Sequence, residues 1–132
     1  MADGMMRDEL PVKFDLLTSN PVYKPFRYPW AYEAWLQQQR IHWLPEEVPL
    51  ADDVKDWQKN LTPSERNLLT QIFRFFTQAD VEVNNCYMKH YSQVFKPTEV
   101  LMMLSAFSNI ETVHIAAYSH LLDTIGMPEI EY

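Results

Sequence analysis

The stretch "LTPSERNLL", residues 61–69, carries the clearest local signal in the chain. Thr62 stands at a helix N-cap, Pro63 at the first helical position, and Glu65 three residues after the cap. This arrangement is a capping box with proline at the position that helix starts favour. It predicts a helix that continues to about Phe95, and ~30 residues at 1.5 Å each make a rod of about 45 Å.

A second long helix is expected beyond "FKPTEV", residues 95–100, where a proline interrupts the first. It should run from about Thr98 to Thr124, because Gly126 and Pro128 then stop it. Its apolar residues cover nearly the whole circumference, which is typical of a helix buried on every side. The remaining elements supply too little surface to bury it, so this helix needs more cover than the sequence contains.

The rest of the chain predicts an all-α fold. Shorter helices are expected at about Trp30–Ile41 and near Asp53–Gln58. Prolines at positions 21, 25 and 29 restrict the residues before them to extended geometry, so residues 1–29 are expected to form an extended arm. Only two glycines are present, which disfavours a hairpin-rich β fold. We therefore expect one helical domain over residues 30–132.

Composition excludes several classes of protein. With 47% hydrophobic residues the chain is too apolar for disorder, and its net charge of −7 argues against a nucleic-acid surface. The N-terminal residues do not resemble a signal peptide, and no continuous apolar run reaches the ~20 residues of a membrane span. Cys86 is the only cysteine, so a reducing compartment is expected. These features favour a cytoplasmic protein with no membrane or nucleic-acid partner.

Polar side chains interrupt the second long helix in "NIETVHIAAYSH", residues 109–120. Glu111, His114 and Tyr118 have the i, i+3, i+7 spacing that places them on one helix face. A Glu-x-x-His pair can direct a carboxylate and an imidazole to one metal. If the two long helices form a hairpin about Lys96–Pro97, Asp80 reaches the same height and can join them. The alternative is a metal-free helical interaction protein, with the histidine bonded to a core carbonyl and the glutamate facing a groove.

Three motifs together resemble a known family. "HWLPEEV" (42–48), "LTPSERNLLTQIFRFFTQAD" (61–80) and "SNIETVHIAAYSHLL" (108–122) are similar, in order and spacing, to the N-terminal part of the radical-generating small (β) subunit of class I ribonucleotide reductase. The resemblance implies a ferritin-like helical bundle. This chain would hold only its first long helix pair and the short N-terminal helices.

The resemblance also implies roles for five residues. Asp80 and His114 would bind one metal ion, and Glu111 would bridge both ions of a di-iron centre, which is replaced by manganese in some members. Tyr118 would carry the stable radical, and Trp43 would relay electrons between the site and the surface.

The implied activity belongs to an assembly. The small subunit pairs with a second small subunit and passes its radical to a large catalytic subunit. That subunit reduces ribonucleoside diphosphates to the deoxyribonucleotides needed for DNA replication. The family resemblance therefore implies an oxidoreductase, with this chain as part of its small subunit.

The sequence departs from the family in its number of ligands. It lacks a further carboxylate on a separate helix and a second Glu-x-x-His. Three interpretations remain open: half of a split subunit completed by a second polypeptide, an inactive fragment, or a homodimer whose two copies assemble a half-ferritin-like di-metal oxidase or storage site. Trp43 and Tyr118 favour the first two, since iron storage has no use for them.

Overall fold

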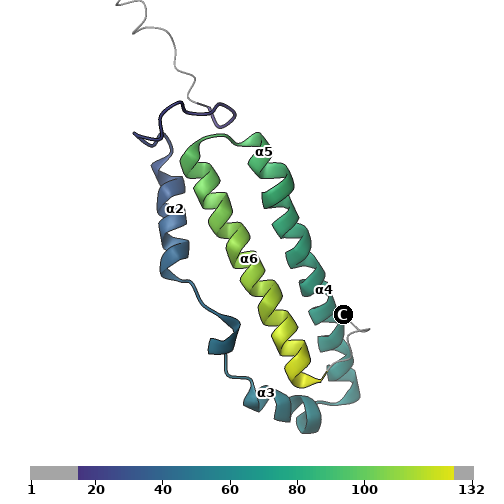
Figure 1. Ribbon diagram of the computed structural model, residues 1–132. Coiled ribbons are helices and arrows are strands. Elements are labelled where there is room, and N and C mark those ends of the chain that lie inside the picture. The colour runs from purple at the N-terminus through teal and green to yellow at the C-terminus, as the bar shows by residue number, and fades with distance from the viewer. Residues whose placement is uncertain (1–14, 127–132) are drawn as a thin grey trace, which may run out of the picture.

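The computed structural model describes residues 15–126, and within them the fold is built from helices without strands (Figure 1). The all-α prediction is confirmed. The elements, in chain order, are α2 (Pro29–Arg40), η1 (Pro45–Glu47), α3 (Ala51–Lys55), η2 (Asp56–Asn60), α4 (Pro63–Asn85), η3 (Cys86–Tyr91), α5 (Ser92–Val94) and α6 (Thr98–Ile125).

The expected N-terminal arm is only partly within the described residues. Residues 15–28 contain no helix, and α2 begins at Pro29, one residue before the predicted start. Residues 1–14 lie outside the described range, so the arm over residues 1–29 stays a prediction, as does the domain over residues 30–132.

The start of α4 matches the sequence prediction atom by atom. The Thr62 hydroxyl accepts a hydrogen bond from the Glu65 backbone N–H at 3.2 Å, and the Glu65 carboxylate accepts one from the Thr62 N–H at 2.7 Å. Each bond satisfies a backbone donor that has no partner inside the helix. The helix therefore begins at Pro63 for a reason that is local in sequence.

The first long helix is not uniform, contrary to the prediction of an uninterrupted α-helix to Phe95. The α-helical pattern ends at Asn85 and gives way to the π-helical turn η3, after which α5 completes the rod. A π turn holds more residues per turn than an α-helix. The apolar periodicity of the sequence did not reveal this change.

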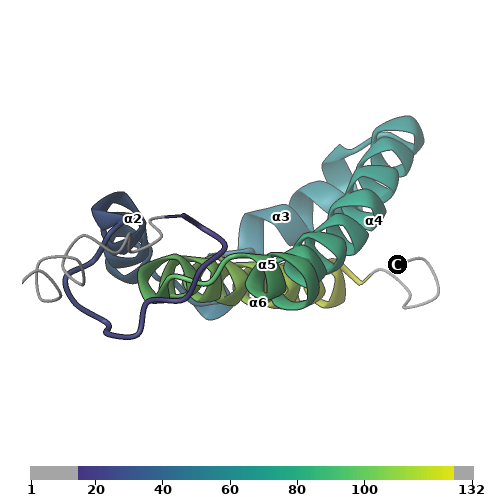
Figure 2. The same cartoon turned by 90° about the horizontal axis from the view of Figure 1, so that it is seen from above.

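Helix α6 ends as predicted. Gly126 has φ of 84°, the left-handed conformation that glycine adopts without a Cβ clash. Its N–H donates to the carbonyls of Leu122 at 3.1 Å and Asp123 at 3.3 Å. Helices α2 and α4 pack on opposite sides of α6, which makes α6 the central element (Figures 1 and 2).

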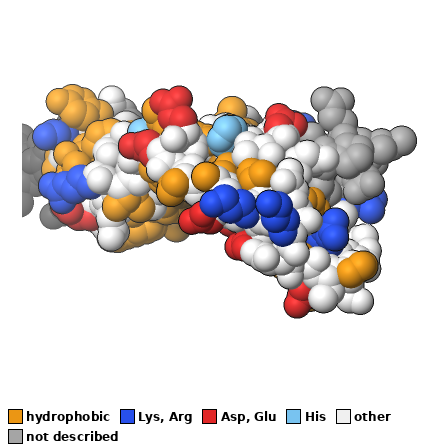
Figure 3. All heavy atoms as spheres, turned by 90° about the horizontal axis from the view of Figure 1, so that it is seen from below, with side chains coloured by type: hydrophobic (Ala, Val, Ile, Leu, Met, Phe, Trp, Pro, Cys, Tyr) orange, Lys and Arg blue, Asp and Glu red, His pale blue; other side chains and the backbone are white. Residues whose placement is uncertain are grey.

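These neighbours leave much of the helix pair uncovered. Helix α4 has no buried residue, and its Leu68 and Phe75 are 60% and 67% exposed. Apolar side chains lie open on the face in Figure 3. On α6 the buried positions are Glu99, Val100, Leu104, Ala106, Ser108, Val113, Leu122 and Ile125. The structure thus agrees with the expectation that α6 needs more cover than this chain supplies.

By length and composition alone, α6 could span a membrane, and it is the one such helix among residues 15–126. This differs from the expectation that no stretch would qualify. A core helix can pass the same test, so one such helix is weak support for a membrane segment; 28% of its most apolar stretch is buried here.

A buried carboxylate joins α2 to α6, and sequence reasoning did not foresee it. Glu99, in the first turn of α6, is 0% exposed, and its Oε1 accepts the backbone N–H groups of Arg27 at 2.7 Å and Tyr28 at 2.8 Å. The position also suits an acidic residue because helix N-termini favour negative charge. Ala31, Val100 and Leu104 form the apolar cluster beside it.

We expect Glu99→Ala to lower the free energy of unfolding by about 2 kcal/mol, since it leaves two partly buried backbone donors without their acceptor. Urea unfolding followed by circular dichroism measures the loss. Glu99→Gln keeps an acceptor oxygen of the same shape and should lose clearly less. Equal losses in the two variants would contradict an anchoring role for the hydrogen bonds.

Candidate metal centre

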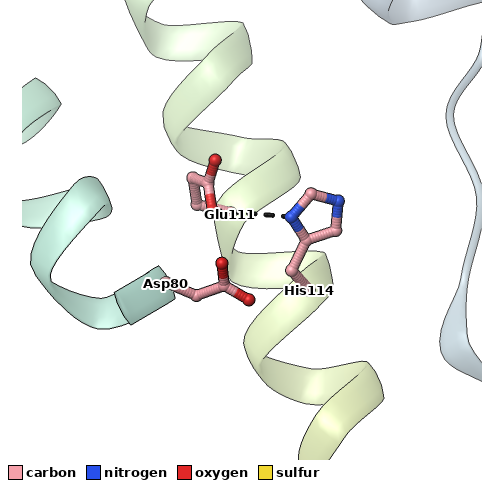
Figure 4. Close-up of side chains that lie close together, drawn as sticks. All are labelled: Asp80, Glu111 and His114. Carbon is pink, nitrogen blue, oxygen red and sulfur yellow. Dashed lines mark ion pairs between the residues drawn. The ribbon is translucent and has the colours of Figure 1, made fainter. Parts of the chain in front are cut away.

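Asp80, Glu111 and His114 converge at the middle of the helix pair (Figure 4). Asp80 comes from α4, and the other two residues come from successive turns of α6. One ligand atom from each residue lies within 4.8 Å of the others. The hairpin prediction that these three residues reach the same height is therefore confirmed.

The charges inside this cluster are poorly compensated. His114 Nδ1 lies 3.5 Å from Glu111 Oε2, which forms an ion pair only when the imidazole is protonated. Asp80 Oδ2 and Glu111 Oε2 are buried and have no hydrogen-bond partner in the structure. Buried oxygens without partners are costly unless a cation or proton compensates them. Two orphaned oxygens beside an imidazole fit a metal ion well.

Burial raises the pKa of Glu111, and the nearby Asp80 carboxylate raises it further, whereas His114 opposes the shift. The cluster thus carries more negative charge than its surroundings stabilise. Carboxylate and imidazole ligands suit divalent iron and manganese. The arrangement can hold a metal ion, and a bound cation would relieve the repulsion between the two carboxylates.

Tyr118 lies beside these ligands, one turn beyond His114 on α6. Its ring stacks on Phe76 with a centroid distance of 6.0 Å and an interplanar angle of 7°. Burial raises the pKa of the Tyr118 phenol, with a further contribution from the Asp80 charge. The phenol therefore keeps its proton at neutral pH.

Trp43 contacts the cluster from the loop between α2 and η1. Its ring centroid lies 6.2 Å from that of His114. Together with Phe76, Asp80 and Tyr118 it lines a cavity of about 460 Å³ next to the three ligands. All five residues singled out in the sequence therefore gather in one region, although they come from three separate segments.

Phe76 is the contact that sequence reasoning missed. It lies four residues before Asp80, a spacing that puts it one turn away on the same side of α4, so helical periodicity could have revealed it. Glu82, the carboxylate two residues after Asp80 on α4, is exposed and accepts a hydrogen bond from Gln78 at 3.0 Å. It takes no part in the cluster.

Comparison with known proteins agrees with this geometry. A model of the family described as "Ribonucleotide reductase, small chain" matches residues 20–132. A probable ribonucleoside-diphosphate reductase small subunit of Invertebrate iridescent virus 6 is 51% identical over 117 residues, which cover 89% of this chain and 32% of that relative. A similarly named protein of Invertebrate iridescent virus 3 is 43% identical, with 89% and 31% covered. Ribonucleoside-diphosphate reductase subunit M2 of Rattus norvegicus is 30% identical, with 83% and 28% covered.

A helix pair that carries two carboxylates and a histidine at one level is the arrangement from which helical di-metal proteins build their sites. The chain belongs to the ribonucleotide reductase small-chain family. It spans about a third of the length of the relatives named above.

The raised pKa of Glu111 predicts how the stability of the metal-free chain depends on pH. Because the pKa is higher in the folded state than in the unfolded state, the folded state binds this proton more tightly. Protonated Glu111 therefore contributes to the free energy of unfolding at low pH, and this contribution is lost as the pH rises through the folded-state pKa. We expect Glu111→Gln to flatten this fall in the free energy of unfolding, measured by urea titration in a chelator at several pH values.

The matched control for this prediction is Glu82→Gln, which changes an exposed carboxylate outside the cluster. It should leave the pH dependence as it is in the unchanged chain. An unaltered slope in Glu111→Gln would contradict the assignment of the raised pKa to Glu111.

Proposed function

We propose that this chain supplies half of the di-metal site of a ribonucleotide reductase small subunit. Asp80, Glu111 and His114 would be the metal ligands. The observation that carries the proposal is the convergence of these three groups within 4.8 Å, with two buried oxygens that lack partners. Membership of the family supports it.

The ligands have distinct roles in this proposal. Asp80 and His114 would hold metal through one carboxylate and one imidazole, and Glu111, which has a carboxylate with two oxygens, could be shared between two ions. When bound, a pair of iron or manganese ions supplies the one-electron oxidation of a tyrosine after reaction with O₂ or a reduced oxygen species. The residues of this chain would hold that centre between α4 and α6.

Tyr118 is the residue to be oxidised. The Tyr118 phenol is protonated at neutral pH, and an oxidised phenol is a strong acid, so its oxidation removes both an electron and a proton. Phe76 covers one face of the ring, and this cover limits the access of reductants to the radical. Trp43 contacts the ligand His114 from an outer loop and is suited to relay electrons between the centre and a large catalytic subunit.

The remaining ligands must come from outside these three residues. A polypeptide that carries the rest of the small subunit would supply them, and a second small subunit would complete the dimer. With the large subunit, this assembly would reduce ribonucleoside diphosphates to deoxyribonucleotides in the cytoplasm. The relatives' names and the share of their length that this chain spans support this assignment.

The first test is metal binding. Dialysis against Fe(II) or Mn(II) without oxygen, followed by elemental analysis, should show metal on the chain once it is complemented with the part of the Invertebrate iridescent virus 6 relative that its match leaves uncovered. Asp80→Asn and Glu111→Gln should each lose most of this metal, because each replaces a charged ligand with a neutral amide.

Glu82→Gln is the control and should bind metal like the unchanged chain. Sedimentation, combined with the metal count from elemental analysis, distinguishes the alternatives. Two ions per pair of unlike polypeptides support the proposal. Two ions per homodimer of this chain alone would instead support the half-ferritin interpretation. Full metal retention in Asp80→Asn and Glu111→Gln would rule out the assigned ligands.

The second test is the radical. The complemented sample, given Fe(II) and then O₂, should show the electron paramagnetic resonance signal and sharp absorption of a tyrosyl radical. Tyr118→Phe should abolish the stable signal, since phenylalanine has no hydroxyl to oxidise. Tyr32→Phe, a change in α2, should keep it. A stable signal of unchanged shape and intensity in Tyr118→Phe would exclude that residue as the radical site.

A further inference from the structure

The π-helical turn η3 has side chains that the proposed function does not use. Its sequence is "CYMKHY", residues 86–91, which places oxidisable cysteine, tyrosine and methionine side chains in one turn and a half. π-helical turns within α-helices are rare and are frequent at functional sites. The turn follows α4, the helix that carries Asp80, so its side chains lie near the ligand cluster.

Tyr87 lies on the side of the cluster that faces the α5–α6 connection. Its ring packs on Phe107 at a centroid distance of 6.0 Å, and Phe107 is one turn before Glu111 on α6. Burial raises the pKa of the Tyr87 phenol, and the Glu111 charge is the next contribution. Tyr118 is on the opposite side, one turn beyond His114, so the three ligands lie between two tyrosines.

From Tyr87 a line of rings leads to the surface. Tyr91 contacts Tyr87 edge-on at a centroid distance of 6.0 Å, and its side chain is 45% exposed. On the other side of the ligands, Tyr118 stacks on Phe76, which has no hydroxyl. A radical on Tyr118 therefore has no oxidisable partner in that stack, whereas one on Tyr87 can move outward to Tyr91.

We propose that Tyr87 and Tyr91 form a second electron-transfer route, through which an oxidised metal centre that fails to oxidise Tyr118 draws its electron from the protein surface. This inference rests on the proposed function. The route would protect the three ligands, because an oxidising equivalent that cannot leave attacks the residues around it.

The electrons and protons balance as follows. Tyr87 would give one electron to an oxidised metal pair held by the ligand cluster and release its phenolic proton to water, to which it is partly exposed. Tyr91 then gives one electron to Tyr87, which takes back a proton, and the exposed Tyr91 phenol releases its own proton. The net change is one electron from Tyr91 to the metal pair and one proton from Tyr91 to solvent.

The test uses the complemented sample in the Tyr118→Phe background, given Fe(II) and O₂ without thiols. Rapid-freeze electron paramagnetic resonance detects a transient tyrosyl radical, and peptide mass spectrometry locates the oxidised residues. We expect oxidation at Tyr91, which is 45% exposed. Adding Tyr87→Phe should remove most of the oxidation at Tyr91, and adding the control change Tyr32→Phe should not.

A second variant tests the route even if Tyr87→Phe does not fold. Adding Tyr91→Phe to the Tyr118→Phe background should leave the transient radical on Tyr87 and lengthen its decay, because the outward step is blocked. Oxidation at Tyr91 that persists in folded Tyr87→Phe, or a decay that Tyr91→Phe does not change, would overturn the route.

Adding Asp80→Asn separates this inference from the function on which it rests. If oxidation depends on Asp80 but not on Tyr87, only the second route is wrong. If oxidation at Tyr91 is the same with and without Asp80→Asn, no metal at the cluster drives it, and the proposed function fails as well.

Discussion

The register of α4 against α6 is the constraint on which the rest of the structure depends. The reversal of the chain at Lys96–Pro97 fixes this register, and it brings Asp80 to the level of Glu111 and His114. A shift of one helical turn would separate the carboxylates by about 5.4 Å along the axis and dissolve the cluster. The same register stacks Phe76 on Tyr118 and seats Tyr87 on Phe107. One packing interface therefore sets both sides of the candidate site.

The interface between α4 and α6 brings two carboxylates together, which is electrostatically unfavourable in the described chain. The two carboxylates face each other with buried oxygens that lack partners, and burial and mutual repulsion both raise the pKa of Glu111. Interior charges of this kind persist in proteins where they are compensated or serve a function. The apolar side chains of α4 are also poorly accommodated, since the described chain has no neighbouring element that buries them. Both features are ones that the proposed completion of the small subunit would explain.

Much of the site could be predicted because its pattern is helical. The spacing of Glu111, His114 and Tyr118 places them on one face without knowledge of any neighbour. The meeting with Asp80 followed from counting residues on either side of the proline break. Phe76, Glu99 and the π turn at Cys86–Tyr91 were missed. The spacing of Phe76 from Asp80 could have revealed that residue, although its importance comes from ring stacking. The hydrogen bonds of Glu99 and the local rewinding at the π turn leave no periodic signal.

Local sequence signals located the start of α4 and the end of α6, and they showed which polar residues share a face of α6. Capping at Thr62 and the left-handed Gly126 involve atoms within about one turn of each other, so the local chain contains the whole cause. Contacts between segments other than the α4–α6 hairpin could be seen only once the chain was folded. The contact between Trp43 and His114 and the Glu99 anchor beneath α2 join residues distant in sequence. Such contacts depend on how each helix is rotated and at what angle the helices cross. The packing of side chains between the helices sets both.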